Sequence, residues 1–211
     1  MESLRHITEQ VTPQSPAVTA DPVLRACFDG VLDFGVTRVT IADIARRAGV
    51  SRMTVYRRYD DLPTLLSAVL TQELSHALAT IEEALPVSLD ARSRAGMAVV
   101  GVTTAVGDHP LLRRVLEVDP EALLPLIVGR LGSTQRLARE HLATMLSGGM
   151  TGRGGDGSIR EADPDLLALT LVVTAQSFVF SGRVVEATDP RAFDELRILV
   201  DAYLSPDRAG T

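Results

Sequence analysis

Arginine side chains crowd into one short stretch of this chain. Between Arg38 and Arg58 there are six arginines and a single acid, Asp43, so the local charge is +5 in a chain of formal charge −6. Guanidinium groups on one surface suit phosphate, because they release counterions from a nucleic-acid backbone while an acidic remainder resists non-specific contact. Charged clusters are also common on ordinary solvated surfaces, so the function of this cluster depends on the secondary structure that carries it.

Two short helices joined by a glycine are predicted to carry these arginines. Thr40 can cap the first helix, and with Asp43 three residues later it resembles a capping box. Gly49 supplies the positive φ that a tight turn needs, and Ser51 caps a second helix from Arg52 to about Tyr59. The first helix has an apolar face at helical spacing, formed by Ile41, Ile44, Ala45 and Ala48.

The spacing of this segment predicts a helix-turn-helix. The small Ala45 lets the two helices approach closely, and Val55 closes the core between them. A helix of this width fits the major groove of DNA, where arginine can grip guanine O6 and N7 together. An αα-corner in another helical protein could share the spacing. Nucleic-acid binding is favoured because the charge coincides with the outward side of the second helix, which carries Arg52, Met53, Tyr56 and Arg57.

Helical periodicity continues along the chain, and no alternating period-2 run stands out. Asp21-Pro22 predicts the start of the first helix, which Gly35 can end. Further helices are expected at 62–85, 89–106, 111–117 and 121–146, the last with a bend near Pro125 or Gly132 as an alternative to a straight helix. Asp-Pro pairs open two more at 163–185 and 189–204. We therefore predict an all-α protein of about nine helices.

Four segments are predicted along the chain. Residues 1–20 form a flexible arm, 21–67 a helix-turn-helix domain, 68–205 a larger helical domain and 206–211 a flexible tail. The glycine-rich stretch 147–158 is predicted to be a mobile loop.

Composition favours a cytoplasmic protein with no membrane partner. Cys27 is the only cysteine, which excludes an internal disulfide framework, and it is expected to be a small core residue. The N-terminus lacks the layout of a secretory signal. The longest apolar run, 166–180, is judged too short and too polar to span a bilayer.

No enzymatic site, metal site or cofactor is predicted. Glu73 and His76 have the Glu-x-x-His spacing of di-iron bundles, but the required second copy is absent. The adjacent Glu82 and Glu83 point in different directions, which suits paired acid–base work poorly. The glycine-rich stretch lacks the Lys-Ser/Thr of a phosphate-binding loop.

The segment TIADIARRAGVSRMTVYRRYDDLPTLLSAVL closely resembles the DNA-binding region of TetR-family transcriptional regulators. The resemblance covers about fifty residues, from Asp21 to Leu70, and beyond them it extends to layout only. It implies a three-helix DNA-binding domain at the N-terminus, followed by a helical bundle for ligand binding and dimerisation. The positions that match the family's pattern are Thr40, Ile41, Ile44, Ala45, Ala48, Gly49, Val50, Ser51, Thr54, Val55, Tyr56 and Tyr59.

The resemblance also implies roles for single residues. Thr40, Thr54 and Tyr56 would contact phosphates. Arg52, Met53 and Arg57 would meet base edges, and Arg58 would touch the backbone or a flanking base. The full DNA-binding set expected is Arg38, Thr40, Ser51, Arg52, Met53, Thr54, Tyr56, Arg57 and Arg58.

Leu62 departs from the family's pattern. Many relatives have at this point a lysine that pins a phosphate at the next helix start. Either Arg57 or Arg58 takes over that contact, or binding is weaker and less dependent on salt.

The last two helices are the expected dimer face, since single helix-turn-helix modules rarely grip DNA alone. The alternative is that their apolar stripes form the monomer's own core. The stripes are Leu166, Leu169, Val173, Ser177, Phe180 and Val184 on one helix and Phe193, Leu196, Leu199, Val200 and Tyr203 on the other.

Members of the resembled family usually hold a small effector among the middle helices. Small residues along 89–106 leave room for one there, although they also permit tight helix packing. An apolar or amphipathic effector is expected, with candidate lining residues Met97, Gly101, Thr104, Leu123, Ile127, Arg130, Gln176 and Phe178.

The sequence thus predicts a dimeric repressor that a small molecule releases from a palindromic double-stranded DNA operator. The alternative is a helical interaction module whose basic surface binds an acidic protein.

Overall fold

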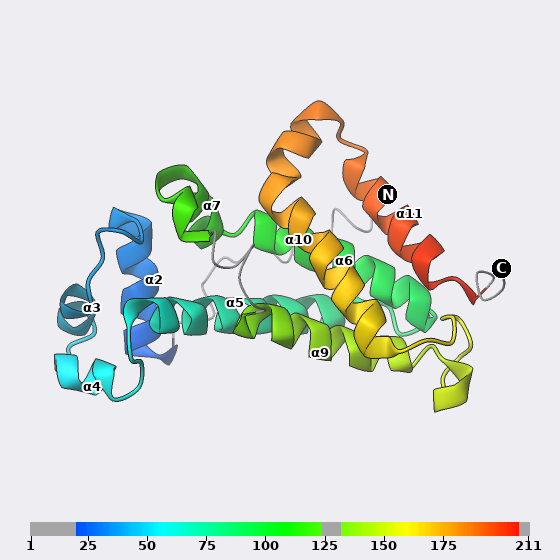
Figure 1. Ribbon diagram of the computed structural model, residues 1–211, viewed down its shortest axis with the longest axis horizontal. Coiled ribbons are helices and arrows are strands. Elements are labelled where there is room, and N and C mark those ends of the chain that lie inside the picture. The colour runs from blue at the N-terminus through cyan, green and yellow to red at the C-terminus, as the bar shows by residue number, and fades with distance from the viewer. Residues whose placement is uncertain (1–19, 124–131, 207–211) are drawn as a thin grey trace. The chain divides into compact units, whose positions relative to one another are not determined.

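The computed structural model describes residues 20–123 and 132–206. These residues form nine α-helices and two short 3-10 turns, and no strand occurs among them (Figure 1). The prediction of an all-α protein is therefore confirmed.

The chain folds into two compact units, and the predicted boundary at residue 67 falls inside a helix. The first unit comprises residues 20–76, 108–123 and 132–136, and the second unit comprises 77–107 and 137–206. The boundary between the units lies within α5 (Leu62–Ala84). The first unit therefore includes α7 (Pro110–Val118) and the 3-10 turn η2 (Pro120–Leu123) besides the helix-turn-helix.

Helix α2 (Pro22–Phe34) begins and ends where the sequence predicts. The carboxylate of Asp21 accepts hydrogen bonds from the amides of Val23 and Leu24, at 2.9 and 3.3 Å. These bonds satisfy two of the amides that a helix start leaves without an intrahelical partner. Gly35 ends the helix with φ of +82° and donates its amide to the carbonyl of Val31.

The inner face of α2 forms the core of the first unit. Cys27 is fully buried there, as expected, and burial raises the pKa of its thiol to about 12. The buried residues of the helix are Val23, Leu24, Ala26, Cys27, Phe28, Gly30 and Val31.

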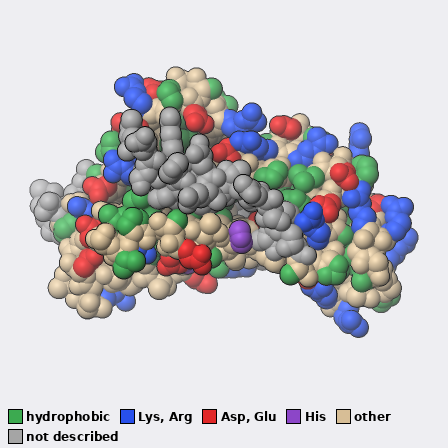
Figure 2. Space-filling model, turned by 180° about the vertical axis from the view of Figure 1, so that it is seen from behind, with side chains coloured by type: hydrophobic (Ala, Val, Ile, Leu, Met, Phe, Trp, Pro, Cys, Tyr) green, Lys and Arg blue, Asp and Glu red, His purple; other side chains and the backbone are tan. Residues whose placement is uncertain are grey.

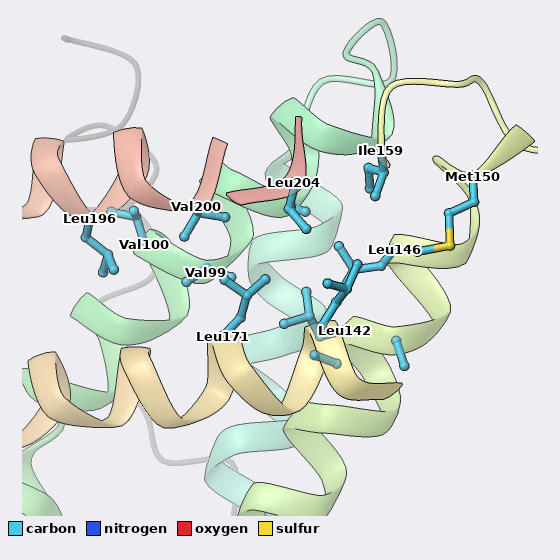
Figure 3. Close-up of a cluster of buried hydrophobic side chains, with 14 residues drawn as sticks. Val99, Val100, Leu142, Leu146, Met150, Ile159, Leu171, Leu196, Val200 and Leu204 are labelled. Atoms are coloured by element: carbon cyan, nitrogen blue, oxygen red, sulfur yellow. The ribbon is translucent and has the colours of Figure 1, made fainter. Parts of the chain in front are cut away.

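The second unit has its own apolar core (Figure 3). Four helices contribute to it: α6 (Ala91–Gly107), α9 (Ser133–Ser147), α10 (Pro164–Thr188) and α11 (Ala192–Leu204). Leu196 and Val200 of α11 lie inside this core. The prediction that these two residues face a second subunit is therefore wrong, because each is already covered by the chain's own helices.

The glycine-rich stretch is ordered, and the prediction that it is mobile is wrong. Met150, just before its 3-10 turn η3 (Thr151–Arg153), and Ile159, just after the stretch, are both buried in the core. Backbone hydrogen bonds cross the stretch, including Gly155 N–H to Met150 O and Ile159 N–H to Gly149 O, both 2.9 Å. The Asp156 carboxylate accepts a hydrogen bond from the Ala91 amide, at 2.8 Å, and so caps α6.

The helix predicted at 121–146 is not continuous. Its first residues form η2, and α9 starts only at Ser133. Gly132 just before α9 donates its amide to the side-chain oxygen of Gln135, at 2.6 Å. Residues 124–131, which lie between the two elements, are outside the described part of the chain.

Helix α10 is longer than the apolar run from which it was predicted. It has 25 residues with a mean hydropathy of 1.5 in its most apolar window, so length and composition alone would allow it to cross a membrane. The judgement that this run is too short is therefore wrong for the helix as a whole. Core helices of soluble proteins meet the same criterion, and Leu167, Ala168 and Leu171 of α10 are buried in the second unit's core.

Burial of Cys27 predicts slow chemical modification. A thiol reagent at pH 8 should label the native protein on the order of 10²–10³-fold more slowly than the protein in denaturant, because attack needs an exposed thiolate. Absorbance of the released thiolate from an aromatic disulfide reagent measures both rates. Equal rates would contradict the buried position.

Candidate nucleic-acid interface

Helix α3 (Ile41–Arg47) and helix α4 (Arg52–Tyr56) form the predicted helix-turn-helix. The Thr40 hydroxyl accepts a hydrogen bond from the Asp43 amide at 3.2 Å. The Ser51 hydroxyl accepts one from the Thr54 amide at 3.1 Å. Both predicted N-caps are therefore confirmed by the geometry.

The turn between the helices depends on Gly49. Its φ is +68°, a value that side-chain-bearing residues rarely adopt, although a Cβ there would meet nothing within 4 Å. Glycine is therefore required by the backbone conformation at this position and not by a lack of space for a side chain. Val50 then donates its amide to the carbonyl of Ala45, at 3.0 Å, which draws the chain back over α3.

A small apolar core sets the orientation of α4. Val55 is its only buried residue. On α3 the buried residues are Ile41, Ile44 and Ala45. Because Val55 points inward, Arg52, Met53, Tyr56 and Arg57 are left exposed on the outer side.

Arginine side chains gather over this part of the molecule, at the right-hand end of Figure 2. Among the residues that the structure describes, neither Arg52 nor Arg57 has a hydrogen-bond or ion-pair partner. Each guanidinium is exposed. Both can therefore bind a ligand without first breaking a bond inside the protein.

Three other arginines of the cluster are already paired with acids. Arg46 pairs with Asp43 at 2.7 Å. Arg47 pairs with Asp33 at 2.8 Å and lies 5.1 Å from the Phe34 ring centre. The local charge counted along the sequence therefore overstates the free charge of the surface.

Arg58 is the third paired arginine, and its partner is Asp21. The guanidinium also lies 5.2 Å from the ring centre of Tyr59, and it donates to that hydroxyl at 3.1 Å. Partial burial raises the pKa of Asp21, but hydrogen bonds from Arg58 and from the amides of Leu24 and Val23 outweigh it and leave the pKa below its usual value. Arg58 thus ties the end of the helix-turn-helix to the start of α2.

Three hydroxyl groups of the predicted DNA-binding set, those of Thr40, Ser51 and Thr54, are also engaged in hydrogen bonds. Thr40 donates its hydroxyl proton to the Asp43 carboxylate, and this bond, with the charge of Arg46, lowers the pKa of Asp43. The hydroxyls of Ser51 and Thr54 lie 2.9 Å apart. To donate to a phosphate, the Thr40 hydroxyl must turn away from Asp43.

Helix α7 holds the loop that leads into α3, which the sequence did not predict. At its C-terminus the Asp119 carboxylate accepts hydrogen bonds from the amide, at 3.2 Å, and the hydroxyl of Thr37. The hydroxyl bond is the main reason that the pKa of Asp119 is lowered, and Arg38 adds to the effect. A side chain at Gly35 would collide with Asp119 and with Val118, so the contact requires glycine there.

The other end of α7 packs on α2 and α5 through a buried polar pair. His109 Nδ1 accepts the Leu111 amide at 3.3 Å, so the ring proton is on Nε2, which lies 3.0 Å from the Glu73 carboxylate. The ring also meets Phe28 edge-on, with centroids 5.9 Å apart. Glu73 therefore pairs with a distant histidine, and the described residues contain no group of three His, Cys, Asp or Glu that could hold a metal ion.

The candidate effector residues that the structure describes pack in different places. Met97 packs in a cluster around Ile81 of α5 and Leu85, which follows that helix, and a side chain at Gly101 would also meet Ile81. Phe178 packs instead on the core of Figure 3, edge-on to Phe193 at 5.7 Å.

The remaining candidates lie elsewhere. The Thr104 hydroxyl donates to the Val100 carbonyl at 3.0 Å, and Gln176 is half-buried on α10. Leu123 is buried in the first unit. Ile127 and Arg130 are outside the described residues.

Residues 32–69 match the family described as "Bacterial regulatory proteins, tetR family". An uncharacterised HTH-type transcriptional regulator of Mycobacterium bovis is 37% identical over 171 residues, which are 81% of this chain and 85% of that protein. An uncharacterised HTH-type regulator of Mycobacterium tuberculosis is 35% identical over the same shares of both chains.

Solved structures share the fold at low sequence identity. The TetR family repressor AlkX from Dietzia, implicated in biodegradation of n-alkanes, has a TM-score of 0.63 at 21% identity, covering 90% of this chain and 95% of that one. The repressor QsdR of R. erythropolis scores 0.64 at 18%, covering 87% and 95%. FadR from Bacillus subtilis, solved with stearoyl-CoA, scores 0.58 at 14%, covering 88% and 100%.

The pairing of Asp21 with Arg58 predicts a pH-dependent change in stability. Asp21→Asn keeps a good helix cap but loses the ion pair, so at pH 7 it should lower the free energy of unfolding by at most about 1 kcal/mol. Asp21→Ala loses the cap as well and should cost about 1 kcal/mol more.

The loss of stability caused by Asp21→Asn should become smaller in acid. A carboxyl with a lowered pKa stabilises the fold above its unfolded pKa of about 3.9, and this contribution is lost as the pH falls through the lower folded value. Urea unfolding at pH 7 and pH 3 measures the difference. An Asn effect that is equal at both pH values would contradict the ion pair as its cause.

Proposed function

The chain belongs to the tetR family of bacterial regulatory proteins, and from this premise we propose that it is a dimeric repressor, released from a palindromic operator by a small apolar or amphipathic effector. Its general function is that of a helix-turn-helix transcriptional regulator. The observation that carries the proposal is the outer side of α4, where two unpaired guanidinium groups stand beside an exposed apolar side chain.

In this proposal α4 lies in the major groove. Arg52, near the N-terminus of the helix, contacts base edges, since these are the positions from which recognition helices reach bases. Thr40, Thr54 and Tyr56 contact phosphates, and such contacts fix the register without specifying sequence.

Arg57 replaces the phosphate contact that the family's lysine makes at the position of Leu62. Arg57 has no partner among the described residues, whereas Arg58 is engaged with Asp21 and Tyr59. Recruiting Arg58 would cost its ion pair and its ring contact, so the structure favours Arg57. Arg58 serves as a brace for the helix-turn-helix.

Helices α10 and α11 supply the dimer face. Val173 and Val184 are 53% and 71% exposed, and Leu166 and Leu199 are also exposed. Large apolar side chains lined up on a surface indicate a contact with another molecule. Ile198, which was not among the expected residues, is exposed beside Leu199 and extends the face.

The effector would act by shifting populations. It would favour a state in which the two reading helices no longer match successive major grooves, about 34 Å apart for sites one turn apart. A coupling on the order of 1–3 kcal/mol is typical of such regulators. Within the first unit, α7 is suited to transmit a conformational change, because it contacts α2 through His109 and the loop before α3 through Asp119.

An apolar effector is consistent with the fold relatives. FadR was solved with stearoyl-CoA, and AlkX is implicated in n-alkane degradation. Met97, Gly101 and Thr104 are the candidate contacts for such a ligand on α6.

Arginine substitutions test the DNA-binding proposal. Arg52→Ala should weaken binding to the preferred palindrome by about 1–3 kcal/mol and relax its preference over scrambled DNA. Arg57→Ala should weaken all sequences alike and reduce the salt slope by about 1. Fluorescence anisotropy with DNA flanking the chain's own coding region measures both.

Arg153→Ala is the matched control, because Arg153 is exposed in the second unit, and it should change neither property. Equal affinity of the wild-type protein for palindromic and scrambled DNA would contradict the proposal and favour an acidic protein partner.

A charged residue introduced on the exposed apolar face of α10 tests whether this face forms the dimer. Val173→Asp should convert a dimer of 22.6 kDa subunits into monomers at about 10 µM, because a buried, unpaired carboxylate costs several kcal/mol. Val87→Asp is the control, since Val87 is 94% exposed in the turn between α5 and α6. Sedimentation equilibrium gives the masses, and a Val173→Asp protein that stays dimeric would refute this face.

A further inference from the structure

Met53 has an apolar side chain that contributes little to the protein's own core. It is 74% exposed, the largest value among the large apolar residues described in the first unit. Helix α4 is held by Val55, its one buried residue, and by the Ser51 cap. Met53 therefore contributes almost no apolar burial to folding, and its place on the outer side calls for another explanation.

The surroundings of Met53 are those of a base-reading side chain. It follows the unpaired Arg52 at the N-terminal end of α4, from which recognition helices reach base edges. Arg52 can donate hydrogen bonds to guanine. The thioether of Met53 has no hydrogen-bond donor, so it cannot pair with the acceptor atoms of a base edge. The one apolar group that base pairs display in the major groove is the C5-methyl of thymine.

We propose that Met53 is a specificity-determining residue that reads thymine through its C5-methyl group, in the same half-site as a guanine bound by Arg52. This assignment rests on the proposed function, because it requires α4 to lie in the major groove. Methionine suits the role, since its unbranched, polarisable side chain adapts to an apolar partner at little steric cost. Contact with the methyl group removes apolar surface of both partners from water.

Deoxyuridine tests the assignment directly, because it differs from thymidine only by the missing C5-methyl group. The probe is a palindrome selected by the full-length wild-type protein from a randomised DNA pool. Each thymine of the half-site is replaced in turn, symmetrically in both half-sites, and the dissociation constant is measured by anisotropy.

At one position the wild-type protein should bind the deoxyuridine palindrome about fifteenfold more weakly, which is about fourfold for each methyl group removed. Met53→Ala should bind both versions of that palindrome equally, while retaining its preference for the guanine. Met53→Leu should keep most of the discrimination, because leucine restores an apolar contact. Val87→Ala, a control at another exposed apolar residue, should keep all of it.

The possible failures are distinguishable. If wild-type protein selects a palindrome but no thymine shows a methyl effect, or if Met53→Ala keeps the effect, the assignment is overturned and the proposed function stands. Uniform weakening of all sequences by Met53→Ala would place Met53 against the sugar–phosphate backbone, and it also overturns the assignment. If the protein selects no sequence at all, the proposed function fails and the assignment fails with it.

Discussion

The close contact between α3 and α4 is the constraint on which the rest of the DNA-binding surface depends. Helix α4 has only five residues, too few to be stable as a helix by itself. Its geometry comes from the positive φ of Gly49, the Ser51 cap and the burial of Val55. The directions of Arg52 and Met53 are thus consequences of apolar packing on the opposite side of the same turn of helix.

Five of the six arginines between Arg38 and Arg58 fall into two sets with different roles. Arg46, Arg47 and Arg58 are paired with acids of their own chain, and they brace the unit that carries α4. Arg52 and Arg57 remain available for a ligand. This division lets a small domain be rigid and still bind a ligand, because Arg52 and Arg57 have no ion pair within the described residues to break before they bind. The acidic partners also limit the positive charge available for indiscriminate contact with DNA.

Local features of the sequence predicted much of the fold and of the site. Asp21, Thr40 and Ser51 are caps, and Gly35 and Gly49 adopt positive φ, because such roles depend on neighbours within a few residues.

Contacts between distant residues could not be predicted in this way. Asp119 and Thr37 are 82 residues apart, and Glu73 and His109 are 36 apart, so no spacing rule pairs them. Leu196 was assigned to a surface because an apolar stripe looks the same whether it faces the core or a partner.

The ordered glycine-rich stretch has a consequence for cleavage by proteases. Arg153 lies exposed in the 3-10 turn of this stretch, next to several glycines. From the sequence alone, trypsin would be expected to cleave there readily. A protease must, however, draw the chain around the cut bond into an extended form. Here the backbone is bonded to itself, and Met150 and Ile159 anchor both flanks in the core. Digestion at Arg153 therefore has to wait until both anchors leave the apolar interior, so the rate of cutting would report how often this part of the core opens.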